Sequence, residues 1–518
     1  MEEENPSETL QLIGKPPPNQ PKKQPPSPPP PPHPPPTLYP TKTTPFTLLI
    51  QPFQWLQMLC KQLNPTFILG IALVYGLSQG FSNSFFKVVT DFYWKDVQKV
   101  QPSVVQLYIG FYYIPWIMKP VWGLLTDVFP VMGYRRRPYF VAAGVIGTVS
   151  AAVVAISGNL PVAVALGCLI GITAGVAIAD VTIDACIARN SIEIRSLAAD
   201  MQSFSGFCSS AGALLGYSSS GFFVHRLGAQ GALGILVAPP AMLVVLGFVI
   251  YESRAPNLAS NNKRKAMEKV DIAIRDMYRT IRCPQVWKPS LYMYLSLALS
   301  ISTHEGQFYW YTDPKAGPAF SQEFVGMIYA VGALASILGI LIYHKTLKDC
   351  PFRTLLFFAQ LIYAISGILD VIFILRWNLA LGVPDYLFVV MEECISRVVA
   401  RVRWMPMIIL STKLCPLGIE GTFFALLMCI DSLGSLSSKW AGGMVLHLLH
   451  VTRSDFTNLW LVVLIRNILR LATLGLIFLV PNVGQSDEVI SSDFLNDTSS
   501  VSEEDDEFQT CLNENVEL

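Results

Sequence analysis

The chain has 518 residues, of which 52% are hydrophobic and only 14% charged, and its mean hydropathy is +0.44. These values exclude an ordinary soluble globular protein. The net charge of zero says little, because it averages segments of very different charge, and we expect no nucleic-acid partner.

The first segment, residues 1–64, is rich in proline, with runs such as Pro28–Pro32. Such a stretch favours polyproline II and cannot form a packed core, so we expect a disordered cytosolic tail. A ligand for SH3-type domains is the alternative. The segment opens with acidic residues and has no early apolar core, which is unlike a cleavable signal or a transit peptide.

Between Thr66 and Val480 about twelve apolar runs are long enough to cross the ~30 Å hydrocarbon core, which needs about 20 helical residues. The run Leu459–Val480 reads as a clean span, whereas Ala177–Ile187 and Tyr386–Leu410 carry charges. Because backbone groups in lipid must be paired within their own segment, we predict an all-α membrane protein.

The basic stretch 254–287 divides the apolar runs into six-helix halves, residues 65–253 and 288–480. This arrangement is typical of two transporter bundles joined by a cytosolic linker. Within the linker, Met267–Met277 is interpreted either as an amphipathic surface helix or as a solvated linker helix. Residues 481–518 are acidic and contain no Lys or Arg, so we expect a second disordered tail.

The loops that follow the even-numbered helices carry roughly eighteen Lys and Arg, against about six in the alternate loops. The positive-inside rule then places the basic loops and both termini in the cytosol. The ten cysteines include no CxxC pair and no GxxxxGK[ST] motif is present, so neither a metal site nor an ATP site is indicated.

Polar residues inside the predicted helices are the candidate functional groups, because a charge facing lipid costs about 2.5–3.5 kcal/mol. Buried acids are candidates for proton coupling, and buried basic residues for binding an anion. The candidates are Asn83 and Lys87 in the first helix, Lys119 in the second, Asp180 and Asp184 in the fourth, Glu393 and Arg397 in the tenth, and Asp431 in the eleventh.

Some of these residues have a simpler interpretation. Glu393 and Arg397, four residues apart, can neutralise each other within one helix, and Lys87 near a helix end can snorkel to the interface. Asp180 and Asp184 are harder to explain in this way, because the sequence offers no nearby cation except Arg189.

Three motifs give the chain a family resemblance. They are Pro115–Asp127 followed by Gly133–Tyr139, Asp180–Ala185 in the fourth helix, and Lys413–Thr422 after the tenth. Together they resemble the signature of the folate–biopterin transporter family, over essentially all of Pro65–Val480, and the two tails resemble those of a plant member.

The resemblance implies a major-facilitator-type fold and secondary active transport of folates or pterins with protons, that is, a symporter without a cofactor. Gly123, Asp127 and the cluster Arg135, Arg136 and Arg137 would form a gating latch on the cytosolic side. Residues 128–132 separate Asp127 from the basic cluster more widely than in the general facilitator motif, which fits the folate–biopterin group.

Three rival functions remain. The chain can be a carrier of another organic anion with the same fold, or a non-transporting receptor or scaffold that works through its tails. An enzyme is not expected, because neither HExxH nor GxSxG is present. We expect a monomer in the plasma membrane or an endomembrane rather than in a plastid.

Overall fold

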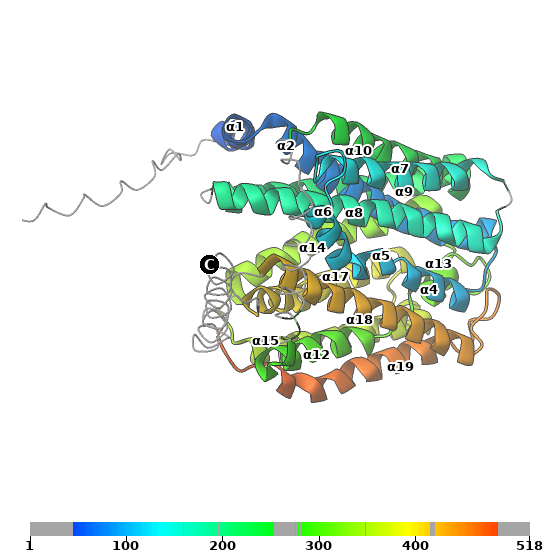
Figure 1. Cartoon of the computed structure of the whole chain (residues 1–518). Coiled ribbons are helices and arrows are strands. Elements are labelled where there is room, and N and C mark those ends of the chain that lie inside the picture. Colours follow the sequence, from blue (N-terminus) through cyan, green and yellow to red (C-terminus); the bar gives the residue numbers. More distant parts are fainter. Residues whose placement is uncertain are drawn as a thin grey trace, which may run out of the picture. The chain divides into compact units, whose positions relative to one another are not determined.

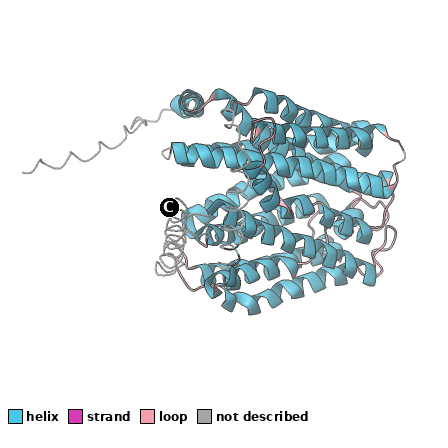
Figure 2. Ribbon diagram, viewed as in Figure 1, coloured by secondary structure: helices cyan, strands magenta, loops and turns pink. Residues whose placement is uncertain are grey.

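The computed structural model describes residues 45–158, 160–194, 197–252, 275, 278, 281–347, 349–414 and 420–484 (Figure 1). Within these ranges the structure is helical and contains no strand (Figure 2). The proline-rich residues 1–44, the acidic tail from residue 485 and, apart from Arg275, the predicted amphipathic segment Met267–Met277 lie outside the described residues.

Helix α1 (Pro45–Gln62) differs from the disordered tail predicted for residues 1–64. Pro45 stands in its first turn, where the missing N–H breaks no helical hydrogen bond. The residues after it are largely apolar, so a helix can form once the proline run has ended. The chain falls into two compact units, residues 1–58 and 59–518, and all helices described below belong to the second.

The first half of this unit consists of the helices before the basic linker. Its helices are α2 (Pro65–Ile71), the π-helix η1 (Ala72–Ser82), α3 (Asn83–Phe92), η2 (Tyr93–Val97), α4 (Pro102–Phe111), α5 (Ile114–Ile117), α6 (Lys119–Val128), α7 (Arg137–Ile156), α8 (Val162–Glu193), α9 (Ala198–Leu233), η4 (Gly234–Val237) and α10 (Ala238–Val249).

The second half follows the linker and lies in the lower part of Figure 1. Its helices are α12 (Pro284–Ala298), α13 (His304–Tyr311), α14 (Gln322–Ile342), η5 (Tyr343–Leu347), α15 (Phe352–Ile374), α16 (Trp377–Ala380), α17 (Asp385–Lys413), α18 (Glu420–Leu448), α19 (Leu459–Ala472) and η6 (Thr473–Leu479).

Seven helical stretches of the described chain are long and apolar enough to cross a membrane. One of them, Asp200–Val249, is divided by Gly228, whose φ of 72° is not helical, and so supplies two spans. The stretches α4–α6, α12–α13, α17 and α18 add four more, which carry charges or breaks. The predicted all-α membrane fold of twelve helices is therefore confirmed.

Breaks in two spans have local causes. Pro115 and Pro120 stand in the first turns of α5 and α6, and a proline ring cannot continue the preceding helix. Residues 299–303 separate α12 from α13, and there the backbone amide of Ser302 donates to the Ser438 carbonyl of α18. Polar backbone groups freed by a break thus find partners inside the protein.

The halves meet along two helix pairs, α9 with α14 and α4 with α18. Glycines allow both contacts. A Cβ placed on Gly221 of α9 would lie 2.3 Å from the Gln322 carbonyl oxygen, and one on Gly443 of α18 would lie 2.8 Å from the Ser103 carbonyl oxygen. Small residues of this kind let helix backbones approach closely inside membranes.

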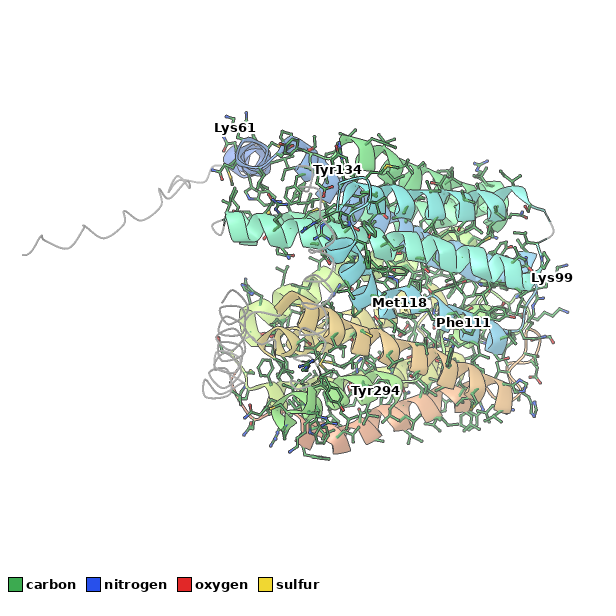
Figure 3. All side chains as sticks on the ribbon, viewed as in Figure 1. Lys61, Lys99, Phe111, Met118, Tyr134 and Tyr294 are labelled. Carbon is green, nitrogen blue, oxygen red and sulfur yellow. The ribbon has the colours of Figure 1, made fainter. Side chains whose placement is uncertain are left out.

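Hydrogen bonds also join the halves at one end of the bundle, which we call the tied end. The ammonium of Lys95 lies 2.6 Å from the Thr312 hydroxyl, and the guanidinium of Arg453 donates to the Lys95 carbonyl at 2.9 Å. Lys99 marks this end in Figure 3. In the same loop as Arg453, hydrogen bonds from Thr457 hold the pKa of exposed Asp455 below its usual value.

Candidate functional site

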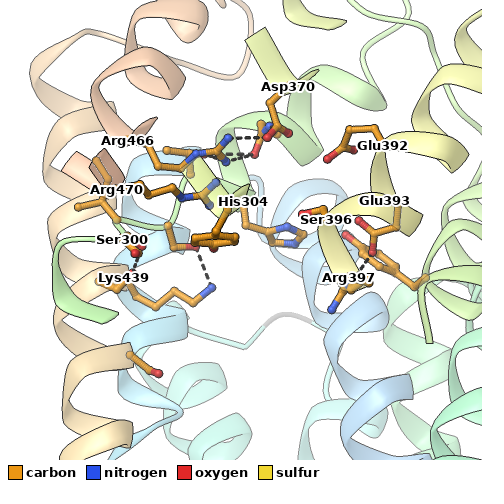
Figure 4. Close-up of a pocket in the computed structure, with 18 of the residues that line it drawn as sticks. Ser300, His304, Asp370, Glu392, Glu393, Ser396, Arg397, Lys439, Arg466 and Arg470 are labelled. Carbon is orange, nitrogen blue, oxygen red and sulfur yellow. Dashed lines mark hydrogen bonds and ion pairs between the residues drawn. The ribbon is translucent and has the colours of Figure 1, made fainter. Parts of the chain in front are cut away.

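A cavity of about 310 Å³, here called the central cavity, opens among the helices of the second half (Figure 4). Helices α12, α13, α14, α15, α17, α18 and α19 of the second half line it, and Tyr113, between α4 and α5, lines it from the first half. Its charged or ionisable lining residues are Tyr113, His304, Tyr311, Tyr329, Tyr363, Asp370, Glu392, Glu393, Arg397, Arg403, Lys439, Arg466 and Arg470. Cations outnumber acids among them, so the cavity suits an anionic ligand that also has hydrogen-bond donors.

One wall of the cavity is a buried ion pair. A guanidinium nitrogen of Arg466 lies 2.6 Å from a carboxylate oxygen of Asp370, and the two side chains are only 6% and 10% exposed. Arg466 also donates to Thr303, and Gln307 donates to Asp370 at 2.7 Å. This network fixes the wall and pairs the two charges, while the Arg466 Nε has no hydrogen-bond partner in the described part of the protein.

Two further arginines have donors that are not used. The guanidinium groups of Arg403 and Arg470 lie over the ring of Tyr363, 4.5 and 4.0 Å from its centroid. Their Nε atoms are buried and have no hydrogen-bond partner in the described part of the protein. Because an unpaired buried donor is costly, these two side chains are ready to receive a carboxylate.

Predicted residues Glu393, Arg397 and Lys87 meet at the opposite wall. Arg397 donates to Glu393 at 2.6 Å, so the two do neutralise each other within α17, and both also line the cavity. Lys87 of the first half and Arg397 lie 4.5 and 5.8 Å from the ring centroid of Tyr329. The tyrosine ring is therefore flanked by cations from both halves.

A second group, the Lys119 cluster, brings together the predicted residues Lys119, Asp180 and Asp184 with Gln79 and Tyr75. Lys119 forms an ion pair with Asp180 at 2.5 Å, and Asp180, 1% exposed, also accepts from Gln79 at 2.8 Å. Tyr75 donates to Asp184. The sequence offers only Arg189 as a nearby cation, whereas the partner of Asp180 in the structure is Lys119 of α6. None of these residues lines the central cavity.

Two predicted residues, Asn83 and Asp431, belong neither to the Lys119 cluster nor to the lining of the central cavity. Asn83 begins α3 and is half-buried. Asp431 of α18 lies close enough to the lining residue Arg403 for electrostatic interaction. Neither residue is joined by a described hydrogen bond to the Lys119 cluster or to the cavity wall.

The predicted gating motif is anchored in a way the sequence did not suggest. The carboxylate of Glu252, after α10, accepts the backbone amides of Arg135, Arg136 and Arg137 at 2.7–3.0 Å. Gly123 lies on α6 beside Val181. The side chain of Asp127 lies outside the described side chains, so the predicted latch stays a prediction.

Several functional residues were missed by the sequence analysis. The run Leu459–Val480 was interpreted as clean, which was wrong, because Arg466 and Arg470 are buried in α19 four residues apart. That spacing puts both on one helix face and was a usable signal. Likewise Asp91 continues the four-residue series that contains Asn83 and Lys87.

Asp91 belongs to a group of three with His304 and Glu305, whose side-chain oxygen and nitrogen atoms lie within 4.8 Å of one another. This spacing is compatible with a metal ion. However, the ammonium groups of Lys87 and Lys439 face the group, and their positive charge disfavours a bound metal cation.

Two halves of membrane-crossing helices and a charged cavity among those helices define the class of protein as a transporter with the major-facilitator fold. Among solved structures, the transporter PepTSo has a TM-score of 0.61 at 12% identity, covering 80% of this chain and 97% of its own. The nucleoside transporter NupG has a TM-score of 0.58 at 12% identity, covering 80% and 99%.

The chain belongs to the BT1 family, whose model matches residues 79–497. Probable folate-biopterin transporter 6 of Arabidopsis thaliana is 64% identical, covering 87% of this chain and 89% of its own. Folate-biopterin transporter of Synechocystis sp. is 29% identical, covering 76% and 78%. Probable folate-biopterin transporter 8, chloroplastic, of Arabidopsis thaliana is 26% identical, covering 80% and 76%. The family resemblance inferred from the motifs is confirmed.

Proposed function

We propose that this chain is a secondary active transporter of folates or pterins that works by alternating access. Membership of the BT1 family and 64% identity to a protein named as a folate-biopterin transporter carry the proposal. The central cavity supports it independently, because its unused arginine donors suit carboxylates and its acids suit an amino-substituted ring.

The substrate has two chemically different ends, and the cavity offers a wall for each. Arg403 and Arg470 receive the glutamate carboxylates, since a guanidinium binds a carboxylate through paired hydrogen bonds. Glu393 accepts from the amino-pyrimidine edge of the pterin, and Tyr329 stacks on its ring. The cavity volume of 310 Å³ is at the lower end of the range for ligand pockets, about 300–1,000 Å³.

Protons are the proposed coupling ion, which makes the chain a symporter. Asp180 and Asp184 supply exchangeable carboxyl groups, and Lys119 competes with a proton for Asp180. Asn83 and Asp431 contribute to binding or coupling from α3 and α18. Asp127 with the arginine cluster acts as a latch at the cytosolic end, broken and remade as the halves rock.

The proposed domain organisation and membrane topology are those that follow from the apolar runs and the charges of the loops. Residues 65–253 and 288–480 form the two halves, residues 254–287 form a cytosolic linker, and both termini are cytosolic. The chain acts as a monomer, without cofactor or catalysis, in the plasma membrane or an endomembrane. One relative is named as chloroplastic, so fractionation of cells that express a tagged chain is the deciding measurement for location.

Uptake of labelled folate and of labelled pterin into proteoliposomes tests the function. Saturable uptake that unlabelled folate competes away is expected, and protein-free liposomes are the control. No saturable uptake of either compound would remove the proposal. Uptake of an unrelated organic anion alone would favour the first rival, a carrier of the same fold with another substrate.

The scaffold rival makes the opposite prediction about the tails. A chain deleted before Asn64 and after Val480 keeps its uptake rate if it is a transporter. If the chain is a receptor or scaffold that works through its tails, the same deletion abolishes function.

A further inference from the structure

The Asp91 cluster, formed by Asp91, His304 and Glu305, joins the two halves near the tied end. Asp91 lies on α3 of the first half, and the other two residues begin α13 of the second. The His304 Nε2 atom lies 2.9 Å from a carboxylate oxygen of Asp91 and 3.7 Å from one of Glu305. Two carboxyl groups and an imidazole therefore share one small space between the halves.

Glu305 is the unusual member of the cluster. Its side chain is 0% exposed, and no N–H or O–H group of the described protein donates to either of its oxygens. The Asp91 carboxyl lies within hydrogen-bonding reach, a contact that needs a proton between the two carboxyl groups. The neighbouring Gln106 of α4 accepts from the Glu305 backbone amide at 3.0 Å, and its own buried Nε2 is also unpartnered. An ionised carboxylate without partners is strongly disfavoured in such a place, whereas a neutral carboxyl is tolerated.

The other ionisable groups that face the cluster do not neutralise Glu305 directly. They are Lys87 on α3, Tyr112 after α4, Tyr309 on α13, Tyr329 on α14 and Lys439 on α18. The ammonium of Lys439 bonds the Ser302 hydroxyl at 2.9 Å, and that of Lys87 lies over the Tyr329 ring. Asp91 places a second carboxyl beside Glu305, so ionising both would put two like charges in one buried space.

His304 gives the cluster a connection to water. Its side chain is 22% exposed and lines the central cavity, whereas Asp91 and Glu305 are buried. An imidazole can accept a proton on one nitrogen and release one from the other, so it can pass protons between the cavity and the buried carboxyl.

We propose that Asp91, His304 and Glu305 form a proton-binding site that holds the tied end closed when occupied and lets it open when empty. The inference rests on the proposed function and adds a proton site, apart from Asp180 and Asp184, that controls the tied end. With the proton bound, Glu305 is neutral and the halves pack closely. After the proton leaves through His304, two carboxylates face each other between the halves, and their repulsion weakens the contact.

A tied end that closes when the Asp91 cluster binds a proton, and opens when it loses the proton, suits a symporter. The open tied end takes up a proton and substrate from outside, and neutralisation of Glu305 allows closure. Release of the proton into the central cavity then returns the empty carrier to its starting state. The proton is taken from water and returned to water, and no other group is consumed.

The test measures opening of the tied end without using folate. Spin labels are attached to cysteines that replace the exposed residues Lys99 and Lys315, one in each half, in a chain freed of its native cysteines. Distances are recorded in liposomes across a range of pH. In the otherwise native chain, raising the pH is expected to shift the population toward the longer distance.

Glu305→Gln, which copies the protonated carboxyl, is expected to keep the short distance at every pH and to lose uptake driven by a pH gradient. Asp91→Asn, a second variant that leaves a single carboxylate, is expected to lose the shift as well. Asp96→Asn removes an exposed carboxylate at the same end and is expected to respond like the native chain. Folate counterflow checks that each variant is folded.

The inference would be overturned if the distance between the labels in the native chain did not change with pH. It would also be overturned if Glu305→Gln changed with pH in the same way as the native chain. If the distance between the labels instead changes with added zinc or sodium at constant pH, the ion that the Asp91 cluster binds is a metal cation and not a proton. If the native chain opens with pH but shows no folate counterflow, the site stands and the proposed function fails.

Discussion

The buried pair of Asp370 and Arg466 allows a prediction with a matched control. Asp370→Asn keeps the shape of the side chain but leaves Arg466, 6% exposed, with only the neutral partners Thr303 and Gln307. Removing one partner of a buried ion pair costs about 3–5 kcal/mol. The control, Asp385→Asn, breaks the pair with Arg376, in which the Asp385 and Arg376 side chains are 16% and 35% exposed. A smaller loss is expected there, because solvent screens the arginine.

Thermal unfolding in detergent, followed by intrinsic fluorescence, measures both variants. The midpoint of Asp370→Asn is expected to fall several times further than that of Asp385→Asn. Replacing both members of the buried pair, as Asp370→Leu with Arg466→Met, is expected to recover most of the loss, because no uncompensated charge remains. Equal shifts for the two single variants, or no recovery in the double variant, would refute the reasoning.

Three further predictions concern transport. Asp184→Asn is expected to abolish pH-dependent folate accumulation while exchange continues, and an accumulation that still follows pH contradicts this. Gly221→Leu is expected to abolish uptake, because even a Cβ at this position would lie 2.3 Å from the Gln322 carbonyl oxygen. The control, Gly206→Ala on the same helix, is expected to keep uptake, because no atom lies within 4 Å of the new Cβ. Similar uptake rates for the two variants would argue against a close contact at Gly221. Arg470→Met is expected to raise KM for folate about 10- to 150-fold, the equivalent of losing a charged hydrogen bond of about 1.5–3 kcal/mol. The KM for a pterin without carboxylates is expected to stay nearly unchanged. An equal rise in KM for both substrates would mean that Arg470 does not bind the carboxylates.

Much of the fold could be predicted because hydropathy and loop charge are properties of single segments. The long apolar runs gave the number of spans even where charges interrupt them, as in α17. The motifs around Lys119 and Asp180 carried the family resemblance, since they are local in sequence. The proline run similarly predicted an irregular tail, although it did not reveal where α1 begins.

The partners of the candidate residues could not be predicted, because they lie on other helices. Asp180 meets Lys119 of α6, and Asp91 meets His304, 213 positions away. The arginine loop binds Glu252 through its backbone amides, a contact that leaves no charge pattern in the sequence. Arg466 and Arg470, like Asp91, had a local signal in their four-residue spacing, and the two arginines were overlooked because the run around them is otherwise apolar.

The break between α12 and α13 has a mechanical consequence. The helical hydrogen bonds of α12 end at the amides of Leu299 and Ser300, and those of α13 resume where the Gln307 amide donates to the Thr303 carbonyl. This membrane crossing therefore consists of two rods joined by a short strap, residues 299–303. The strap is fastened to α18, where Ser438 donates to the Ser300 carbonyl at 2.8 Å and accepts from Ser302. Helix α13, the rod of eight residues, carries His304 and is followed directly by Thr312, the partner of Lys95. A tilt of α13 against α12 would therefore move both of these contacts between the halves together.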